Sequence, residues 1–344
     1  MSLLKKDQPA RIAVLSAGAW GTALAIMLSR KGNPVKLWSR RREVAKAMQR
    51  ERESRPHFPG VPFPATLQAT DNLEEALDQT PVMVLVPASH GMRDLARQTA
   101  PYYQGQIVVS ATKGLEVATL KRMSEVIREE IPVLPTDHLG TLSGPNFSIE
   151  VIRELPTASV VASPSSWTST QIQELFMTPS FRVYTSGDQV GVELGGSLKN
   201  IYAIGVGIIE GLGLGQNARA AFITRGLAEM IRLGKAMGAN PLTFSGLSGL
   251  GDLVLTCTGD YSRNRQAGLA LGGGKGIQEI LGEARAVIEG IATTEAAHHL
   301  AHKYGITMPI VDEMYQILFQ GKEPRRSVPA LMSRLKTEEV ETLS

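Results

Sequence analysis

One lysine stands out because it lies inside an otherwise apolar stretch. Lys199 follows Gly195-Gly196-Ser197-Leu198 and precedes Asn200 and the apolar run 201–209, which predicts a long buried helix with the lysine near its start. Burying an ammonium group is costly unless an anion or a polar partner balances it. We therefore expect the Lys199 amine to face a cleft, toward an anion or a carbonyl oxygen, where desolvation fits a lysine for proton transfer. The alternative is a lysine at a helix start whose amine extends to water.

Two other polar groups lie in the second half of the chain. Asp252 follows a glycine-rich segment, 246–251, at a predicted helix start, where it either caps the helix or orients Lys199 and holds a substrate hydroxyl. Ser262, Arg263 and Asn264 open another predicted helix. A hydroxyl, a guanidinium and an amide at a helix start could cradle a phosphate. The alternative is a capping serine beside exposed arginines.

Polar residues also follow two predicted strands in the first half. Lys113 comes shortly after the apolar strand 106–110, and Gly144 and Asn146 follow the short strand 139–142. Ligands of open α/β sheets bind at the carboxyl ends of the strands. These residues are therefore expected to line a ligand crevice.

The first 40 residues predict a dinucleotide-binding unit. An apolar strand, 11–16, leads into a turn, a helix ending near Lys31 and a second strand, 34–38. Gly18 and Gly21 match the second and third glycines of the phosphate-binding fingerprint, whereas Ser16 takes the place of the first. If the φ angle at Ser16 is positive, the backbone there is strained by about 1–3 kcal/mol.

The residues after the second strand indicate which cofactor binds. Arg40 and Arg41 stand where NAD-specific proteins place an acid. Arginine can clamp the 2′-phosphate of NADP, so NADPH is the favoured cofactor and NADH remains possible. The alternative is a solvated charge run that opens the next helix.

The pattern of elements predicts an α/β protein with two domains and a tail. Further strands at 82–86, 157–162 and 181–186 extend a Rossmann-like, doubly wound sheet over residues 1–189. Strand signals then vanish. Helical patterns such as 217–237, apolar nearly all round, indicate an all-helical substrate-binding domain over 190–335, followed by a charged tail at 336–344.

Composition excludes several classes of function. The chain has 344 residues and a net charge of +3, too small to predict nucleic-acid binding. It has one cysteine, Cys257, and no apolar run of the about 18 residues needed to span a membrane. The first eleven residues do not form a secretory signal, so we expect a cytoplasmic protein without stable membrane insertion. No cluster of histidines and cysteines predicts a metal site.

Several motifs together resemble bacterial NAD(P)-dependent glycerol-3-phosphate dehydrogenase, from about Arg11 to about Gly321. The motifs, in chain order, are Ala17-Gly18-Ala19-Trp20-Gly21-Thr22, Ala111-Thr112-Lys113-Gly114-Leu115-Glu116, Ser143-Gly144-Pro145, Gly195-Gly196-Ser197-Leu198-Lys199-Asn200, Gly249-Leu250-Gly251-Asp252-Leu253 and Ser262-Arg263-Asn264-Arg265. The order and spacing of the later motifs carry most of the specificity.

The resemblance implies reversible reduction of dihydroxyacetone phosphate to sn-glycerol 3-phosphate for glycerophospholipid synthesis, in a protein expected to be a homodimer. It implies that Lys199 is the general acid/base, assisted by Lys113 and Asp252. It implies substrate contacts at Lys113, Gly144, Asn146, Lys199, Asp252, Ser262, Arg263 and Asn264. It implies cofactor contacts at Gly18, Ala19, Trp20, Gly21, Arg40, Arg41, Lys113, Ser148, Arg263, Val287 and Glu289.

The chain departs from this family at two positions of the pyrophosphate turn. Similar proteins usually have glycine at the position of Ser16 and serine at that of Ala19, so the departures bear on cofactor affinity more than on the chemistry. Two other functions stay open. One is a related NADP-dependent hydroxyacid dehydrogenase, which gives no reason for the Ser262-Arg263-Asn264 group. The other is a non-catalytic NADPH-binding sensor, against which the two lysines and Asp252 speak.

Overall fold

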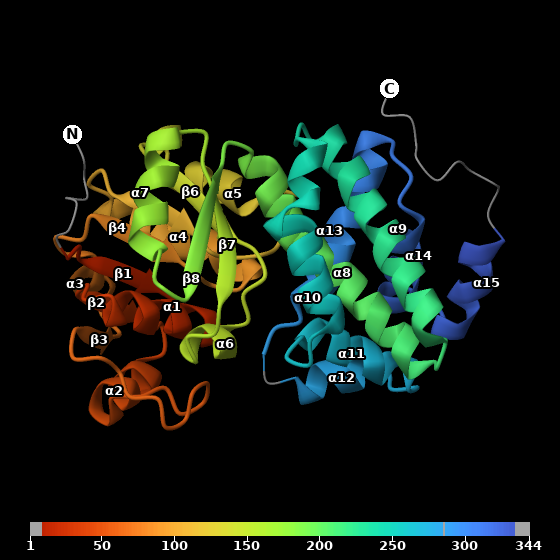
Figure 1. Ribbon diagram of the computed structural model, residues 1–344, viewed down its shortest axis with the longest axis horizontal. Coiled ribbons are helices and arrows are strands. Elements are labelled where there is room, and N and C mark those ends of the chain that lie inside the picture. The colour runs from red at the N-terminus through yellow and green to blue at the C-terminus, as the bar shows by residue number, and fades with distance from the viewer. Residues whose placement is uncertain (1–8, 285, 334–344) are drawn as a thin grey trace.

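The computed structural model describes residues 9–284 and 286–333, and the predicted tail at 336–344 lies outside them. A sheet-containing half and a helical half lie side by side (Figure 1). The sheet has eight strands in the order β3-β2-β1-β4-β5-β6-β7-β8. Their bounds are β1 Ile12–Leu15, β2 Val35–Trp38, β3 Leu67–Thr70, β4 Val82–Leu85, β5 Ile107–Ser110, β6 Leu139–Ser143, β7 Thr157–Ala162 and β8 Phe181–Ser186. Only the β6–β7 pairing is antiparallel, so the doubly wound α/β fold predicted for this half is confirmed.

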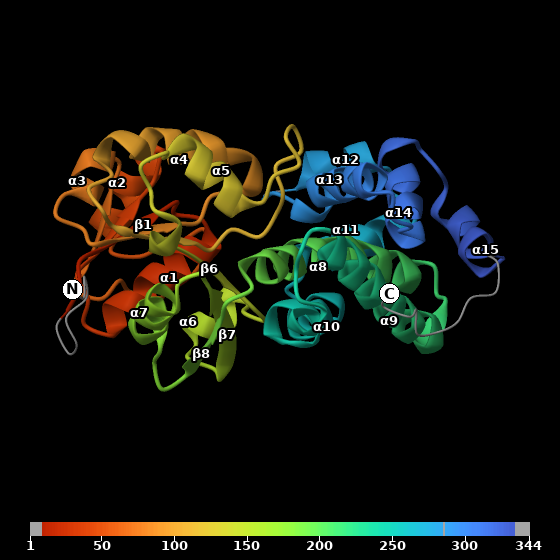
Figure 2. The ribbon, with the colours of Figure 1, turned by 90° about the horizontal axis from the view of Figure 1, so that it is seen from above.

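The central strands are buried on both faces, as their unbroken apolar sequences predict. Ile12 and Val14 of β1 pack in one hydrophobic core, whereas Ala13 and Leu15 pack in another, because successive side chains of a strand point to opposite faces. Helices cover both faces (Figure 2). On one face lie α1 (Ala19–Arg30), α6 (Ser148–Ile152) and α7 (Ser166–Phe176); on the other lie α3 (Leu73–Leu77), α4 (Met92–Thr99) and α5 (Met123–Glu130). A further helix, α2 (Arg42–Glu51), follows β2.

The second half is built around one buried helix, α8 (Gln189–Gly211), and its described residues contain no strand. Packed against it are α9 (Gly215–Ala236), α10 (Asp252–Thr258), α11 (Arg263–Gly272), α13 (Glu289–Tyr304) and α14 (Pro309–Phe319). Helix α12 (Ile277–Glu283) packs against α11, and α15 (Ser327–Met332) packs against α14. None of the helices in the described part of the chain is long and apolar enough to cross a bilayer.

Two details of this half differ from the prediction. Helix α8 has 23 residues and begins at Gln189, because the side chain of Asp188 caps it by accepting a hydrogen bond from Gly191 N. Lys199 therefore lies in the middle of the helix, not near its start. Helix α9 is not buried all round: its first half is largely exposed, and only a stripe including Met230 and Leu233 is buried.

Helices α8 and α11 approach so closely that glycine is required at their crossing. A Cβ atom at Gly268 would lie 1.9 Å from the carbonyl oxygen of Ile204, and one at Gly207 would lie 2.0 Å from that of Arg265. A side chain on either glycine would push apart the helices that carry Lys199 and Arg263.

We expect Gly268→Ala to lower the free energy of unfolding by about 3 kcal/mol, because the added methyl group meets rigid backbone. Gly282→Ala is the matched control, since a Cβ atom there meets nothing within 4 Å. Urea unfolding followed by circular dichroism measures both. Equal stability of the two variants would contradict the close-packing argument.

Candidate active site

A buried carboxylate bridges the two lysines that the sequence analysis selected. Lys199 Nζ donates to Asp252 Oδ1 at 2.6 Å, and Lys113 Nζ donates to Asp252 Oδ2 at 2.7 Å. Asp252 is fully buried, and Lys199 is 6% exposed. Lys199 comes from the middle of α8, Asp252 from the first turn of α10 and Lys113 from the segment after β5. The two halves of the chain therefore meet at this carboxylate.

Lys113 is also held by the segment after β6. Its Nζ donates to the carbonyl oxygen of Gly144 at 2.8 Å and to Asn146 Oδ1 at 3.0 Å. The Asn146 amide in turn donates to Ser159 Oγ at 3.0 Å.

Burial lowers the pKa of Lys113 to about 8, and the nearby carboxylate of Asp252 offsets this only in part. This ammonium group can thus lose its charge within the range of ordinary assays.

A threonine that the sequence analysis missed completes the surroundings of Lys199. Thr256 Oγ1 accepts a hydrogen bond from Lys199 Nζ at 2.6 Å and donates to the carbonyl oxygen of Asp252 at 2.7 Å. It lies four residues after Asp252, so both side chains are on the same face of α10. That spacing could have identified it once Asp252 was placed at a helix start. Thr256 fixes the direction in which the Lys199 amine points.

The predicted phosphate cradle at the start of α11 is assembled only in part. Ser262 caps the helix, since its Oγ accepts a hydrogen bond from Arg265 N at 3.2 Å. Arg265 turns away and pairs with Glu210 at 2.9 Å. Arg263 is exposed to solvent. The structure therefore has a capping serine beside an exposed arginine. The Arg263 guanidinium is accessible to an anion.

Asn264 is tied to the helix that carries Lys199. Its Nδ2 donates to Asn200 Oδ1 at 2.9 Å, and its Oδ1 accepts from Gly290 N at 2.9 Å. This pair of hydrogen bonds fixes the start of α11 against α8 and the first turn of α13.

The dinucleotide-binding turn has the strained geometry that the sequence allowed for. Ser16 has φ +114°, in the region that favours glycine. A Cβ atom at Gly21 would lie 2.0 Å from Ser16 O, whereas one at Gly18 would meet nothing within 4 Å. The backbone at Gly18 is therefore open at the start of α1, where Ala19 and Trp20 form the first turn. A pyrophosphate fits this position, because the amide groups of a helix start are free to bind it.

Ser16→Gly tests this strain. We expect it to raise the free energy of unfolding by about 1 kcal/mol, because glycine adopts a positive φ without a steric penalty. Ser16→Ala is the control, since alanine keeps the penalty. Chemical denaturation compares the three proteins, and a glycine variant no more stable than the alanine variant would show that the turn is not strained.

The other predicted cofactor positions lie around the carboxyl ends of the strands. Arg40 and Arg41 are exposed after β2, and Ser148 opens α6. Val287 is 40% exposed. Glu289, the first residue of α13, accepts hydrogen bonds from Ser89 N at 3.0 Å and Ser89 Oγ at 2.5 Å. Ser89 follows β4 and was missed, because no local pattern predicts a partner 200 residues away.

The fold and this geometry are typical of nicotinamide-dependent oxidoreductases, in which a nucleotide-binding sheet packs against a second, helical part of the chain. Residues 11–168 match the family described as NAD-dependent glycerol-3-phosphate dehydrogenase N-terminus, and residues 188–329 match the corresponding C-terminus family. The chain belongs to the NAD-dependent glycerol-3-phosphate dehydrogenase family.

Individual relatives agree over nearly the full chain. Glycerol-3-phosphate dehydrogenase [NAD(P)+] of Pelotomaculum thermopropionicum is 49% identical over 335 residues, which is 97% of this chain and 96% of that protein. The enzyme of the same name from Moorella thermoacetica is 49% identical over 96% of this chain and 98% of its own. The crystal structure of glycerol-3-phosphate dehydrogenase from Coxiella burnetii superimposes with a TM-score of 0.91 at 41% identity, covering 95% of this chain and 99% of that one. These relatives confirm the predicted family and favour it over the hydroxyacid dehydrogenase and the sensor.

Proposed function

We propose that this chain reduces dihydroxyacetone phosphate to sn-glycerol 3-phosphate with NADPH, with NADH as a second cofactor, and that it also catalyses the reverse reaction. The bound nicotinamide supplies the hydride that the C2 carbonyl carbon receives. The observation that carries the proposal is the Asp252 carboxylate shared by Lys113 and Lys199. Two ammonium groups and one carboxylate leave a net positive charge in a buried pocket, which favours an anionic substrate and a developing alkoxide.

Each member of this trio has a distinct proposed role. Lys199 donates a proton to the C2 oxygen as the carbonyl is reduced, and it takes the hydroxyl proton back in the reverse direction. Lys113 stabilises the negative charge that develops on the same oxygen and contacts the cofactor. Asp252 holds both amines in place through its two oxygens, 2.6 Å and 2.7 Å from them.

The remaining residues are proposed to bind the two ligands. The Ser262 hydroxyl accepts its capping bond, so its own hydrogen is available for a phosphate oxygen beside the Arg263 guanidinium and the Asn264 amide. Gly144 and Asn146 would border the carbon chain of the substrate. The cofactor would contact Gly18, Ala19, Trp20, Gly21, Arg40, Arg41, Lys113, Ser148, Arg263, Val287 and Glu289.

The titration of Lys113 gives a pH prediction. Because its pKa lies at about 8, the amine is a cation below that pH and neutral above it. We expect kcat/KM for dihydroxyacetone phosphate to fall as pH rises through about 8, since this parameter reports the free enzyme. In Lys113→Arg the fall should shift to higher pH, because guanidinium stays charged. An unchanged profile in that variant would assign the pH dependence to another group.

One assay tests the proposed function directly. Purified protein is given dihydroxyacetone phosphate and either nicotinamide, and oxidation is followed by the loss of absorbance of the reduced cofactor. We expect turnover, faster with NADPH. Tight NADPH binding without turnover would support the sensor, and turnover only with unphosphorylated hydroxyacids would support the related dehydrogenase.

We also propose a cellular setting and an assembly. The division into a cofactor domain, 1–189, and a substrate domain, 190–335, is supported by the two family matches. The proposed product, sn-glycerol 3-phosphate, would be used for glycerophospholipid synthesis, and we propose that the enzyme acts in the cytoplasm. We propose a homodimer as the assembly, in which a second copy would cover the groove of about 690 Å³ between α8, α9, α14 and α15. Light scattering coupled to size-exclusion chromatography would distinguish a dimer from a monomer.

A further inference from the structure

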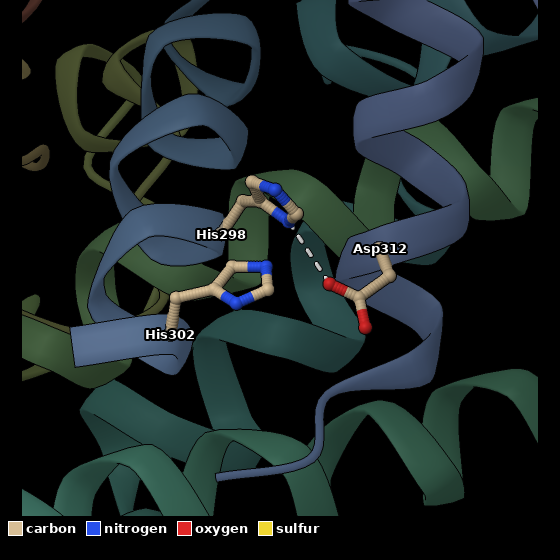
Figure 3. A group of neighbouring side chains, drawn as sticks. All are labelled: His298, His302 and Asp312. Atoms are coloured by element: carbon tan, nitrogen blue, oxygen red, sulfur yellow. Dashed lines mark hydrogen bonds and ion pairs between the residues drawn. The ribbon is translucent and has the colours of Figure 1, made fainter. Parts of the chain in front are cut away.

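A second group of side chains, with atoms that can bind a metal ion, lies in the helical half on α13 and α14. His298 and His302 are four residues apart on α13 and so lie on one face of that helix, and Asp312 belongs to the first turn of α14. Figure 3 shows these three side chains pointing toward one another between the two helices. One ligand atom from each lies within 4.8 Å of the others. The sequence analysis, which sought histidine–cysteine clusters, did not anticipate this group.

Contacts with neighbouring side chains hold the central member of the group, His298, in place. His298 Nδ1 lies 2.9 Å from Asp312 Oδ1, and the His298 ring stacks on Tyr315 with centroids 4.0 Å apart and an interplanar angle of 9°. The His302 ring meets the His298 ring edge-on, with centroids 4.5 Å apart. Packing thus fixes the His298 ring, whereas the more exposed His302 and Asp312 side chains can rotate toward an ion.

The group is also open to solvent. The side chain of His298 is 18% exposed and that of Asp312 is 40% exposed, while His302 is an exposed residue. The nearby carboxylate of Glu313 is paired with Lys322, so it does not compete for a cation. A hydrated ion can therefore reach the three ligand atoms without any rearrangement of the backbone.

We propose that His298, His302 and Asp312 bind one divalent cation of the zinc type, with water completing the coordination. Two imidazole nitrogens and a carboxylate oxygen suit Zn²⁺ and similar d-block ions, whereas Mg²⁺ and Ca²⁺ prefer all-oxygen sites. Ligand atoms on a tetrahedral zinc ion with bonds of ~2.0–2.2 Å lie ~3.3–3.6 Å apart, so modest rotations of the exposed side chains bring this group into range. Each histidine would ligate as a neutral imidazole through one ring nitrogen, and Asp312 through a carboxylate oxygen.

The ion would fasten α14 to the helix whose first residue, Glu289, is bonded to Ser89 in the sheet-containing half. His298 lies nine residues after Glu289, about 13 Å further along the axis of α13, and the hydrogen bonds described above for the paired lysines involve none of the three proposed ligands. An ion that binds only the folded chain raises its stability. The expected result is a site that supports the helical half and takes no part in the reduction.

Calorimetric titration of tag-free, chelator-treated protein with ZnCl₂ tests the proposal. We expect about one equivalent to bind and the thermal midpoint to rise with zinc but not with equal MgCl₂. His302→Ala and Asp312→Asn should each weaken zinc binding at least about tenfold. Loss of a residue that only hydrogen-bonds to a metal ligand already weakens binding by about that factor. Their midpoints without metal should stay near that of the parent, because both residues lie at the surface.

His299→Ala is the matched control, because it removes an exposed histidine of the same helix that is not among the three ligands. It should retain parental zinc affinity. Absence of zinc binding, binding that His302→Ala leaves unchanged, or equal weakening by His299→Ala would each overturn the proposal. Turnover of dihydroxyacetone phosphate is a separate readout, so its absence would affect the proposed function and not this site.

Discussion

Lys199→Met should lower kcat for the reduction of dihydroxyacetone phosphate about 10³-fold or more. The substitution keeps the volume of the side chain but removes both the proton that the C2 oxygen takes up and the positive charge beside it. A positioned general acid contributes about 10²–10⁴-fold and a charge at a developing oxyanion about 10²–10³-fold, so their joint loss is large. Because Lys199 is proposed not to touch the nucleotide, NADPH affinity should change far less than kcat.

Steady-state kinetics and NADPH fluorescence titration measure the two effects separately. Lys275→Met is the matched control, because Lys275 is an exposed lysine that pairs with Glu279 and Glu283 at the surface. It should retain parental kinetics. A Lys199→Met variant that keeps more than a tenth of the parental kcat would remove the general acid from the mechanism.

Asp252→Asn should damage both stability and activity, because it leaves two ammonium groups facing one another without an anion. Removing one partner of a buried ion pair costs about 3–5 kcal/mol, and Asp252 is the partner of two. We expect the free energy of unfolding to fall by about 3 kcal/mol and kcat to fall at least about 10²-fold, since both amines lose their orientation. The amide keeps the shape of the side chain, so the loss of charge is the main change.

Denaturation and kinetics on the same preparation test this expectation. Asp94→Asn is the control, because the Asp94 side chain is 74% exposed and its pair with Arg97 lies at the surface. It should change stability by less than about 1 kcal/mol. An Asp252→Asn protein as stable as the Asp94→Asn protein would mean that the buried carboxylate does not balance the lysines.

Strands with unbroken apolar sequences could be predicted from the sequence. A short strand at the edge of the sheet could not. The sequences of β1, β4 and β5 are almost wholly apolar and were expected near their observed positions. Strand β3, at Leu67–Thr70, was not expected, because Gln68 is exposed and the segment follows a proline-rich loop. Its place at the edge of the sheet depends on pairing with β2, which local sequence does not encode.

The start of α8 was misplaced because glycines usually disfavour a helix interior. Here they are needed for close packing: a Cβ atom at Gly195 would lie 2.7 Å from Ser248 O, and one at Gly196 would lie 2.4 Å from Ser143 Oγ. These contacts come from other elements, so single-sequence reasoning could not have found them.

The sequence was enough to name the main residues of the site, but not to predict their contacts. Lys199 was selected because it lies in an apolar stretch, Lys113 because it follows a strand, and Asp252 because it follows a glycine-rich segment at a predicted helix start. Their sharing of one carboxylate depends on how two halves of the chain meet. The same reason explains why Thr256 and Ser89 were missed, since each acts through a partner that only the fold supplies.

A crystal structure of the enzyme with NADP+ and sn-glycerol 3-phosphate would locate the substrate relative to the two lysines. We expect the C2 hydroxyl oxygen within hydrogen-bonding distance, about 2.6–3.2 Å, of Lys199 Nζ, with Lys113 Nζ beside it. We also expect the phosphate at Arg263, as the proposed mechanism requires. A complex with the phosphate between the two lysines and the C2 hydroxyl away from Lys199 would contradict it.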